Sequence, residues 1–223
     1  MCFLKNKILD HLYFISGFGA DERIFSNFIS KGNEVYFIPW LIPAKKEPLI
    51  DYAKRMAAYI HHKDPVLIGL SFGGIMCIEI SKIFPVKAVI LISSMKSLEE
   101  MPFWMRFAGA TMLHRILPLR SFKLIESLEN YNLGIETFEE KKMMASYRKN
   151  IDQQYTNWAI NIILTWKNTW NPAKLFHIHG RKDRLLPIRN IKADYVIETG
   201  GHMMILNRAN EVNEAVNKIL SSL

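Results

Sequence analysis

The chain has little cysteine and no long hydrophobic run. Only 2 of its 223 residues are cysteine, namely Cys2 near the N-terminus and Cys77 in an apolar, helix-like segment. We therefore expect no structural disulfide and a reducing, cytoplasmic environment. The apolar stretch after Lys7 is broken by Asp10 and His11, so the sequence predicts neither a signal peptide nor a transmembrane span.

The chain also lacks a basic tract, an internal repeat and a low-complexity segment. Its formal net charge is +8, but Lys and Arg exceed Asp and Glu by 3 in residues 1–94, by 2 in 95–171 and by 3 in 172–223. An excess spread this evenly is typical of a solvated surface, so we expect no nucleic-acid partner. The hydrophobic fraction of 49% and the charged fraction of 22% are those of a globular protein with one well-buried core.

Short apolar runs alternate with helix-like spacers along much of the chain. Several runs are hydrophobic at every position, as strands buried on both faces of a parallel sheet are. The spacers have apolar residues at helical spacing. This alternation predicts an α/β fold with a doubly wound, mostly parallel sheet. The predicted strands are Leu12–Ser16, Val35–Pro39, Pro65–Leu70, Lys87–Ser93, Lys174–His179 and Asp194–Glu198, and the predicted helices are Leu49–His61, Gly74–Phe84 and Asn210–Leu220.

The alternation stops between Met95 and Asn171, a stretch with no strand pattern. We therefore predict a core of residues 1–94 and 172–223 and a helical cap inserted at 95–171. Its density of large apolar side chains suits an apolar substrate pocket, for which Trp104, Phe107 and Trp158 are the candidates. Ordinary packing into the core is the alternative for each of them.

The most informative segment is Val66–Gly74, where an apolar run leads into Gly-Leu-Ser-Phe-Gly. A serine exposed at the tip of a strand needs a sharp, strained turn, and glycines at positions 69 and 73 leave room for it. Ser71 would then lie over the N-terminus of the following helix and act as a nucleophile. A serine that only caps this helix is the alternative interpretation.

A serine hydroxyl needs a base and a carboxylate that orients the base. Asp183 follows the predicted strand that ends at Gly180, and His202 follows the next one after two glycines. We predict that these two residues complete a triad with Ser71. The backbone N–H groups of Phe18, in the glycine turn after the first strand, and of Phe72 are the candidate oxyanion donors. A solvated turn aspartate, a helix-capping histidine and a glycine turn without a catalytic role are the alternatives.

Two further histidines, His177 and His179, lie on one face of a predicted strand. No third ligand accompanies them at a recognisable spacing, so we expect strand packing and no metal site.

Taken together, the motifs Gly-Leu-Ser-Phe-Gly, His-Gly-Arg-Lys-Asp and Gly-Gly-His, in the order Ser71, Asp183, His202, resemble the α/β-hydrolase superfamily with a helical cap. The resemblance covers nearly the whole chain and implies a Ser-His-Asp hydrolase that needs no cofactor. Ser16 stands where the usual His-Gly-x-Gly turn has its histidine. The first predicted strand comes so early that the two N-terminal strands of the standard sheet are expected to be reduced or missing.

This resemblance implies a small-molecule substrate. We expect a serine hydrolase that cleaves a carboxylic ester or thioester, with an apolar acyl part, through an acyl-enzyme intermediate. Two alternatives stay open. The same triad can cleave a carbon–carbon bond or act as a lyase, and a hydrolase-fold protein can bind a ligand with little turnover.

Overall fold

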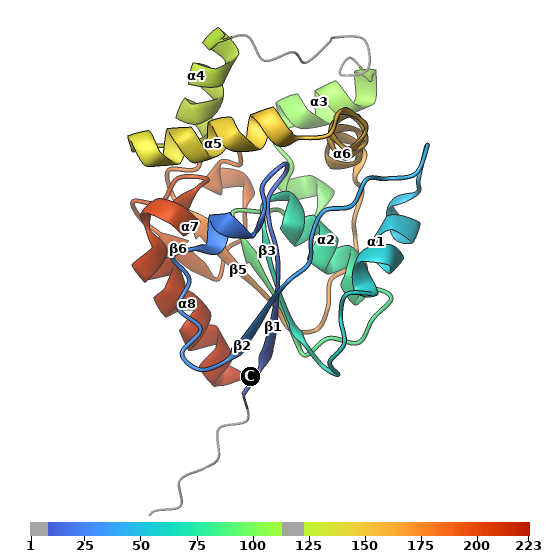
Figure 1. Ribbon diagram of the computed structural model, residues 1–223, viewed down its shortest axis with the longest axis vertical. Coiled ribbons are helices and arrows are strands. Elements are labelled where there is room, and N and C mark those ends of the chain that lie inside the picture. Colours follow the sequence, from blue (N-terminus) through green and yellow to red (C-terminus); the bar gives the residue numbers. More distant parts are fainter. Residues whose placement is uncertain (1–8, 113–122) are drawn as a thin grey trace, which may run out of the picture.

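A six-stranded, all-parallel sheet forms the centre of the protein (Figure 1). The computed structural model describes residues 9–112 and 123–223. The strand order is β2-β1-β3-β4-β5-β6, so the chain moves first to one edge and then to the other. The strands are β1 (His11–Ile15), β2 (Glu34–Phe37), β3 (Val66–Leu70), β4 (Ala88–Ile92), β5 (Leu175–Gly180) and β6 (Tyr195–Ile197).

Side chains along each strand point alternately to the two faces of the sheet, and they form one hydrophobic core on each face. One core joins Leu12, Ile68 and Ile90 to the helix at the C-terminus of the chain, and the other joins Tyr13 and Leu67 to the helices before and after β3. Every residue of β3 and β4 is buried. The continuous apolar runs of these central strands are thus explained by helices on both faces of the sheet.

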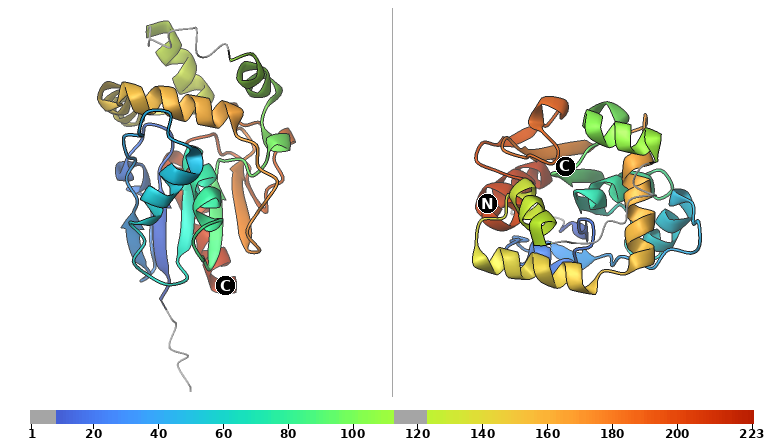
Figure 2. Two further views of the ribbon diagram at one scale, coloured as in Figure 1. Left: turned by 90° about the vertical axis from the view of Figure 1, so that its right-hand side faces the viewer. Right: turned by 90° about the horizontal axis from the view of Figure 1, so that it is seen from above.

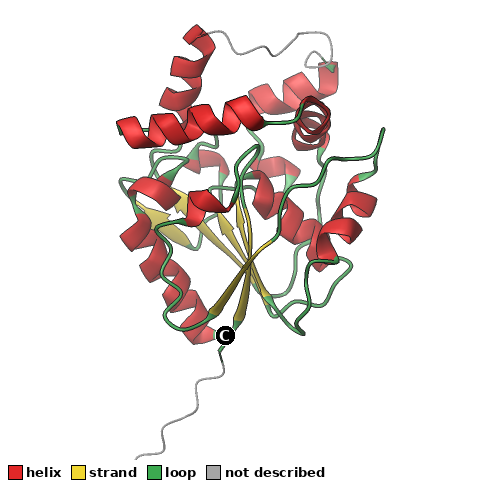
Figure 3. Ribbon diagram, in the orientation of Figure 1, coloured by secondary structure: helices red, strands yellow, loops and turns green. Residues whose placement is uncertain are grey.

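The covering helices form a layer on each face of the sheet (Figure 3). α1 (Leu49–Ala57) and α2 (Phe72–Ser81) pack on one face, and α8 (Ala209–Ser222) packs on the other with the short α7 (Met204–Asn207). The connections also contain the 3-10 helices η1 (Glu22–Phe25), η2 (Leu98–Glu100) and η4 (Ile188–Asn190). In the part of the chain that the structure describes, no helix combines the length and the apolar character needed to cross a bilayer.

Among the described residues, four α-helices lie between β4 and β5, at the carboxyl ends of the strands (Figure 1). Seen from above, α5 and α6 run along two sides of this end of the sheet (Figure 2). α5 begins with a capping box between Thr137 and Glu140, and α6 begins where Asp152 accepts the N–H of Tyr155. The four helices are α3 (Phe103–Thr111), α4 (Lys123–Leu133), α5 (Phe138–Asn150) and α6 (Gln153–Thr165).

The predicted fold class is confirmed, because the sheet is parallel throughout and has helices on both faces. The six predicted strands match those observed to within two residues at each end. The helix predicted over Leu49–His61 is shorter, since it ends at Ala57. The cap boundaries at residues 95 and 171 stay predictions.

Candidate active site

The turn between β3 and α2 holds Ser71 in a strained backbone conformation. Its φ is 52° and its ψ is −117°, a region that side-chain-bearing residues seldom occupy. A Cβ at Gly69 would collide with the carbonyl of Gly73, and one at Gly73 would collide with the carbonyl oxygens at the end of β1. The two glycines of the motif are therefore required by close backbone approach.

Ser71, His202 and Asp183 meet at the carboxyl ends of the strands. Oγ of Ser71 lies 2.9 Å from Nε2 of His202, and Nδ1 of His202 lies 2.8 Å from Oδ2 of Asp183. A carboxylate only accepts, so Nδ1 carries the proton and Nε2 offers its lone pair to the serine hydroxyl. His202 is 1% exposed and Asp183 is 4% exposed, which shields the arrangement from water.

The Asp183 carboxylate is held on both of its oxygens. Oδ1 accepts the N–H groups of Leu185 and Leu186 at 2.9 and 2.8 Å, while Oδ2 faces His202. Nε2 of His179 lies 3.4 Å from Oδ2 and donates to the carbonyl of Leu186 at 2.8 Å. These contacts hold the carboxylate against Nδ1 of His202.

The glycine turn after β1 is braced by side chains. The Ser16 hydroxyl donates to the carbonyl of Ala20 at 2.6 Å and accepts the indole N–H of Trp40 at 3.0 Å. The same indole N–H reaches the carbonyl of Gly17 at 3.1 Å. A Cβ at Gly17 would lie 3.5 Å from Cβ of Ser71, so this turn, which carries Phe18, borders the serine.

An apolar cavity of about 490 Å³ opens beside Ser71. Trp104, one of the three pocket candidates from the sequence, is among the residues that line it. The other two candidates, Phe107 and Trp158, are not among the lining residues. Phe107 is 56% exposed and faces outward, and Trp158 packs on Tyr52 with its indole N–H on the carbonyl of Glu47 at 2.8 Å. The lining residues are Phe18, Ser71, Phe72, Ile75, Ser94, Met95, Trp104, Met105, Ala108, Glu129, Ile160, Ile163, Leu164, Leu185 and Leu186.

The end of α4 touches the loops that carry the acid and the base. The N–H of Met203 donates to the carbonyl of Leu133 at 2.9 Å, next to His202. Arg184, next to Asp183, donates to the carbonyl of Tyr131 at 2.8 Å and lies over its ring. The inserted helices therefore help to position the loops as well as forming a wall of the cavity.

This arrangement of the sheet and its helices is similar to that of solved structures. A lipase-esterase related protein from Clostridium acetobutylicum superimposes with a TM-score of 0.67 at 16% identity, covering 94% of each chain. MenH from S. aureus gives 0.71 at 17% identity over 97% of this chain and 96% of its own. The chain has the α/β-hydrolase fold.

A third similar structure is a meta-cleavage product hydrolase from Pseudomonas fluorescens IP01, with a TM-score of 0.68 at 13% identity over 96% of this chain and 91% of its own. No protein-family model and no curated protein sequence matches the chain.

The site also contains residues that the sequence analysis missed. Ser94 donates to the carbonyl of Ser71 at 2.7 Å, and Trp40 braces the glycine turn. Both come from segments with no recognisable motif.

Proposed function

We propose that this protein is a serine hydrolase that cleaves a carboxylic ester or thioester through an acyl-enzyme intermediate. The observation that carries the proposal is the continuous hydrogen-bonded line from Ser71 through His202 to Asp183, with distances of 2.9 and 2.8 Å. A serine that only capped α2 would not need its positive φ, and its side chain makes no cap hydrogen bond.

In the proposed reaction, Ser71 Oγ attacks the substrate carbonyl carbon while its proton moves to Nε2 of His202. The N–H groups of Phe18 and Phe72 stabilise the oxyanion; Phe72 lies in the first turn of α2, where N–H groups have no partner within the helix. The tetrahedral species expels the alcohol or thiol, which takes the proton from His202. Water then repeats these steps on the acyl-enzyme and releases the acid.

The proposed substrate has an apolar acyl part. The cavity beside Ser71 is lined mainly by apolar side chains, and its volume of about 490 Å³ is within the range of small-molecule sites. No residue in the proposed reaction requires a cofactor. Cys77 is free and buried, which agrees with the cytoplasmic location that we propose from the low cysteine content.

Two other functions use the same site. The likeness to a meta-cleavage product hydrolase makes carbon–carbon bond cleavage the second candidate. A ligand-binding protein with little turnover is the third. A panel of p-nitrophenyl esters and acyl thioesters of graded chain length separates the first candidate from both others.

The nucleophile is tested with a fluorophosphonate probe. We expect one adduct, mapped to Ser71 by mass spectrometry and lost in Ser71→Ala. Ser81→Ala is the matched control, because Ser81 ends α2 at the opposite end from the Ser71 turn and its substitution should leave the labelling in place. Labelling that persists in Ser71→Ala, or an adduct on Ser94, would overturn the assignment.

A further inference from the structure

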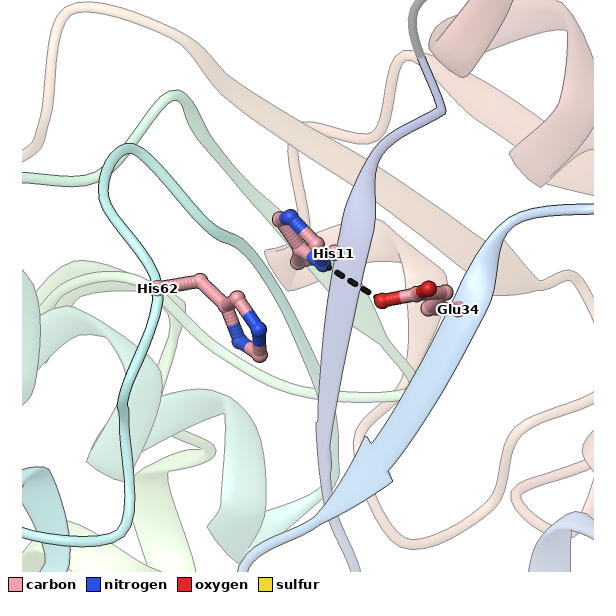
Figure 4. A group of neighbouring side chains, drawn as sticks. All are labelled: His11, Glu34 and His62. Atoms are coloured by element: carbon pink, nitrogen blue, oxygen red, sulfur yellow. Dashed lines mark ion pairs between the residues drawn. The ribbon is translucent and has the colours of Figure 1, made fainter.

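Three potential metal ligands meet at the end of the sheet opposite the candidate active site (Figure 4). His11 is the first residue of β1 and Glu34 is the first residue of β2, and the two are paired in the strand register. His62 comes from the loop before β3. One ligand atom from each residue lies within 4.8 Å of the other two. We propose that His11, Glu34 and His62 form a binding site for a divalent transition metal such as Zn²⁺.

The contact between His11 and Glu34 is the tightest part of the cluster. Nδ1 of His11 lies 3.0 Å from Oε2 of Glu34. The same nitrogen is closed off from solvent and has no hydrogen-bond partner within residues 9–112 and 123–223, so the contact lacks hydrogen-bond geometry. A metal ion held between the two atoms would satisfy both the nitrogen lone pair and the carboxylate charge.

Two of the three ligand atoms, those of His11 and Glu34, have nearly the spacing of a tetrahedral site. With bonds of about 2.0–2.1 Å, tetrahedral zinc ligands lie about 3.4 Å apart. His11 and Glu34 already approach this separation, and His62 has to move by up to about 1.5 Å to match the same spacing. His62 is on a loop, and its ring stacks on that of His11 with centroids 3.8 Å apart. Because the two ring planes are only 15° apart, their lone pairs point along nearly parallel planes, so the His62 ring must also turn out of this stack to bring a nitrogen to the ion.

Neighbouring tyrosines orient the ligands. The Tyr36 hydroxyl donates to Oε2 of Glu34 at 2.7 Å and holds the pKa of that carboxyl below its usual range, which favours the ionised form that binds metals. Oη of Tyr13 lies 2.6 Å from Nδ1 of His62 and accepts the backbone N–H of His61 at 3.1 Å. Contacts of this kind to the outer side of metal ligands fix ring orientation and raise metal affinity.

The chemistry of the three donors selects the ion. Two imidazole nitrogens and one carboxylate oxygen suit Zn²⁺, Co²⁺, Ni²⁺ or Cu²⁺, whereas Ca²⁺ and Mg²⁺ prefer oxygen ligands throughout. A bound ion would connect the starts of β1 and β2 to the loop before β3. Since the site is at the amino ends of parallel strands and the triad is at their carboxyl ends, the ion stabilises the fold and takes no part in the proposed hydrolysis.

The test uses the full-length chain without a histidine tag, after treatment with a chelator and dialysis. Titration calorimetry with Zn²⁺ should show one ion per chain. At a Zn²⁺ concentration about 100 times the dissociation constant, the Tm should rise by about 5–10 °C. Replacement of Zn²⁺ by Co²⁺ should give visible d–d absorption from a site with nitrogen ligands.

Glu34→Gln and His62→Gln should each weaken Zn²⁺ binding by at least about tenfold. His61→Gln is the matched control, because the exposed His61 side chain is next to His62 and is outside the cluster; it should bind Zn²⁺ as the natural chain does. Ester hydrolysis by Glu34→Gln should be unchanged. The proposal is overturned if the natural chain binds no Zn²⁺, or if both substitutions leave the affinity intact, which would place the ion elsewhere.

Discussion

Nδ1 of His179 lies 3.3 Å from Nε2 of His177, and both rings are completely buried behind the Asp183 carboxylate. The carbonyl of Leu186 requires a proton on Nε2 of His179, so the neutral ring accepts at Nδ1 from Nε2–H of His177. Burial lowers the pKa of both histidines, that of His177 strongly, and the neighbouring ring lowers that of His177 further. The pair is thus neutral in the folded protein.

This neutral pair makes stability depend on pH. An unfolded histidine binds a proton below about pH 6.5, and the lowered pKa values of the buried rings move their protonation to lower pH. The unfolded chain therefore binds more protons as the pH falls below this value, and the free energy of unfolding should decrease by up to about 1.4 kcal/mol per pH unit for each histidine that stays neutral. Urea unfolding between about pH 7 and pH 5 measures this slope.

Two substitutions distinguish the contribution of the buried histidine pair to this slope from that of the exposed histidines. His177→Leu removes one of the two titrating groups, so its slope should be shallower than that of the natural chain, whereas His61→Gln should leave the slope unchanged. A free energy of unfolding that is constant over this pH range would contradict the prediction.

Asp183 should be the carboxylate that orients His202. In Asp183→Asn the amide offers a donor to Nδ1 and favours the wrong imidazole tautomer, so kcat should fall by about 10³–10⁴ with the fold intact. The matched controls are Asp194→Asn and Glu198→Gln. Asp194 accepts the backbone N–H of His177, and Glu198 pairs with the exposed Arg181, so both variants should keep kcat within about tenfold. If Asp183→Asn stayed active and one of the two control variants lost most of its kcat, the residue changed in that control would be the carboxylate that orients His202.

The contact between α4 and the His202 loop should matter for turnover. Gly134 has a φ of +70°, and a Cβ there would lie 3.3 Å from Cα of Gly201. Gly134→Ala should therefore cost about 1 kcal/mol of stability and displace the loop that carries His202, which lowers kcat. Gly32→Ala is the control, since Gly32 also has a positive φ but a Cβ there would meet only the Leu9 side chain, at an ordinary contact distance of 3.8 Å. Gly32→Ala should lose a similar amount of stability and keep its kcat. Equal losses of kcat in both variants would show that the contact between α4 and the His202 loop has no specific effect on turnover.

The sequence predicts those structural features that are determined by residues close to one another along the chain. The Ser71 turn is one example, because its strain and its two close backbone approaches involve residues within a single short segment and the adjacent strand end. The strands were predicted well for the same reason, since burial on both faces produces continuous apolar runs. The α/β fold follows from these two local patterns.

Features that depend on packing between distant segments were not predictable. The sequence predicted a helical cap over residues 95–171 but not which face of α3 or α6 meets the cavity, so Met105 and Ile163, which line it, were not among the candidates. The cluster of His11, Glu34 and His62 has no sequence spacing in common with known metal sites. It forms only because parallel strands bring their amino ends together.

The cap wall should set the acyl-chain preference of the proposed esterase. Trp104 lines the cavity beside Ser71, whereas Phe107, one helical turn away on α3, is outside it. Trp104→Ala should raise the KM for long acyl chains far more than for acetyl esters, because each lost methylene contact is worth up to about 0.8 kcal/mol. The measurement is kcat/KM for p-nitrophenyl esters of graded chain length. Phe107→Ala is the matched control and should keep the natural profile. An unchanged profile in Trp104→Ala, with normal folding, would show that the acyl chain binds elsewhere.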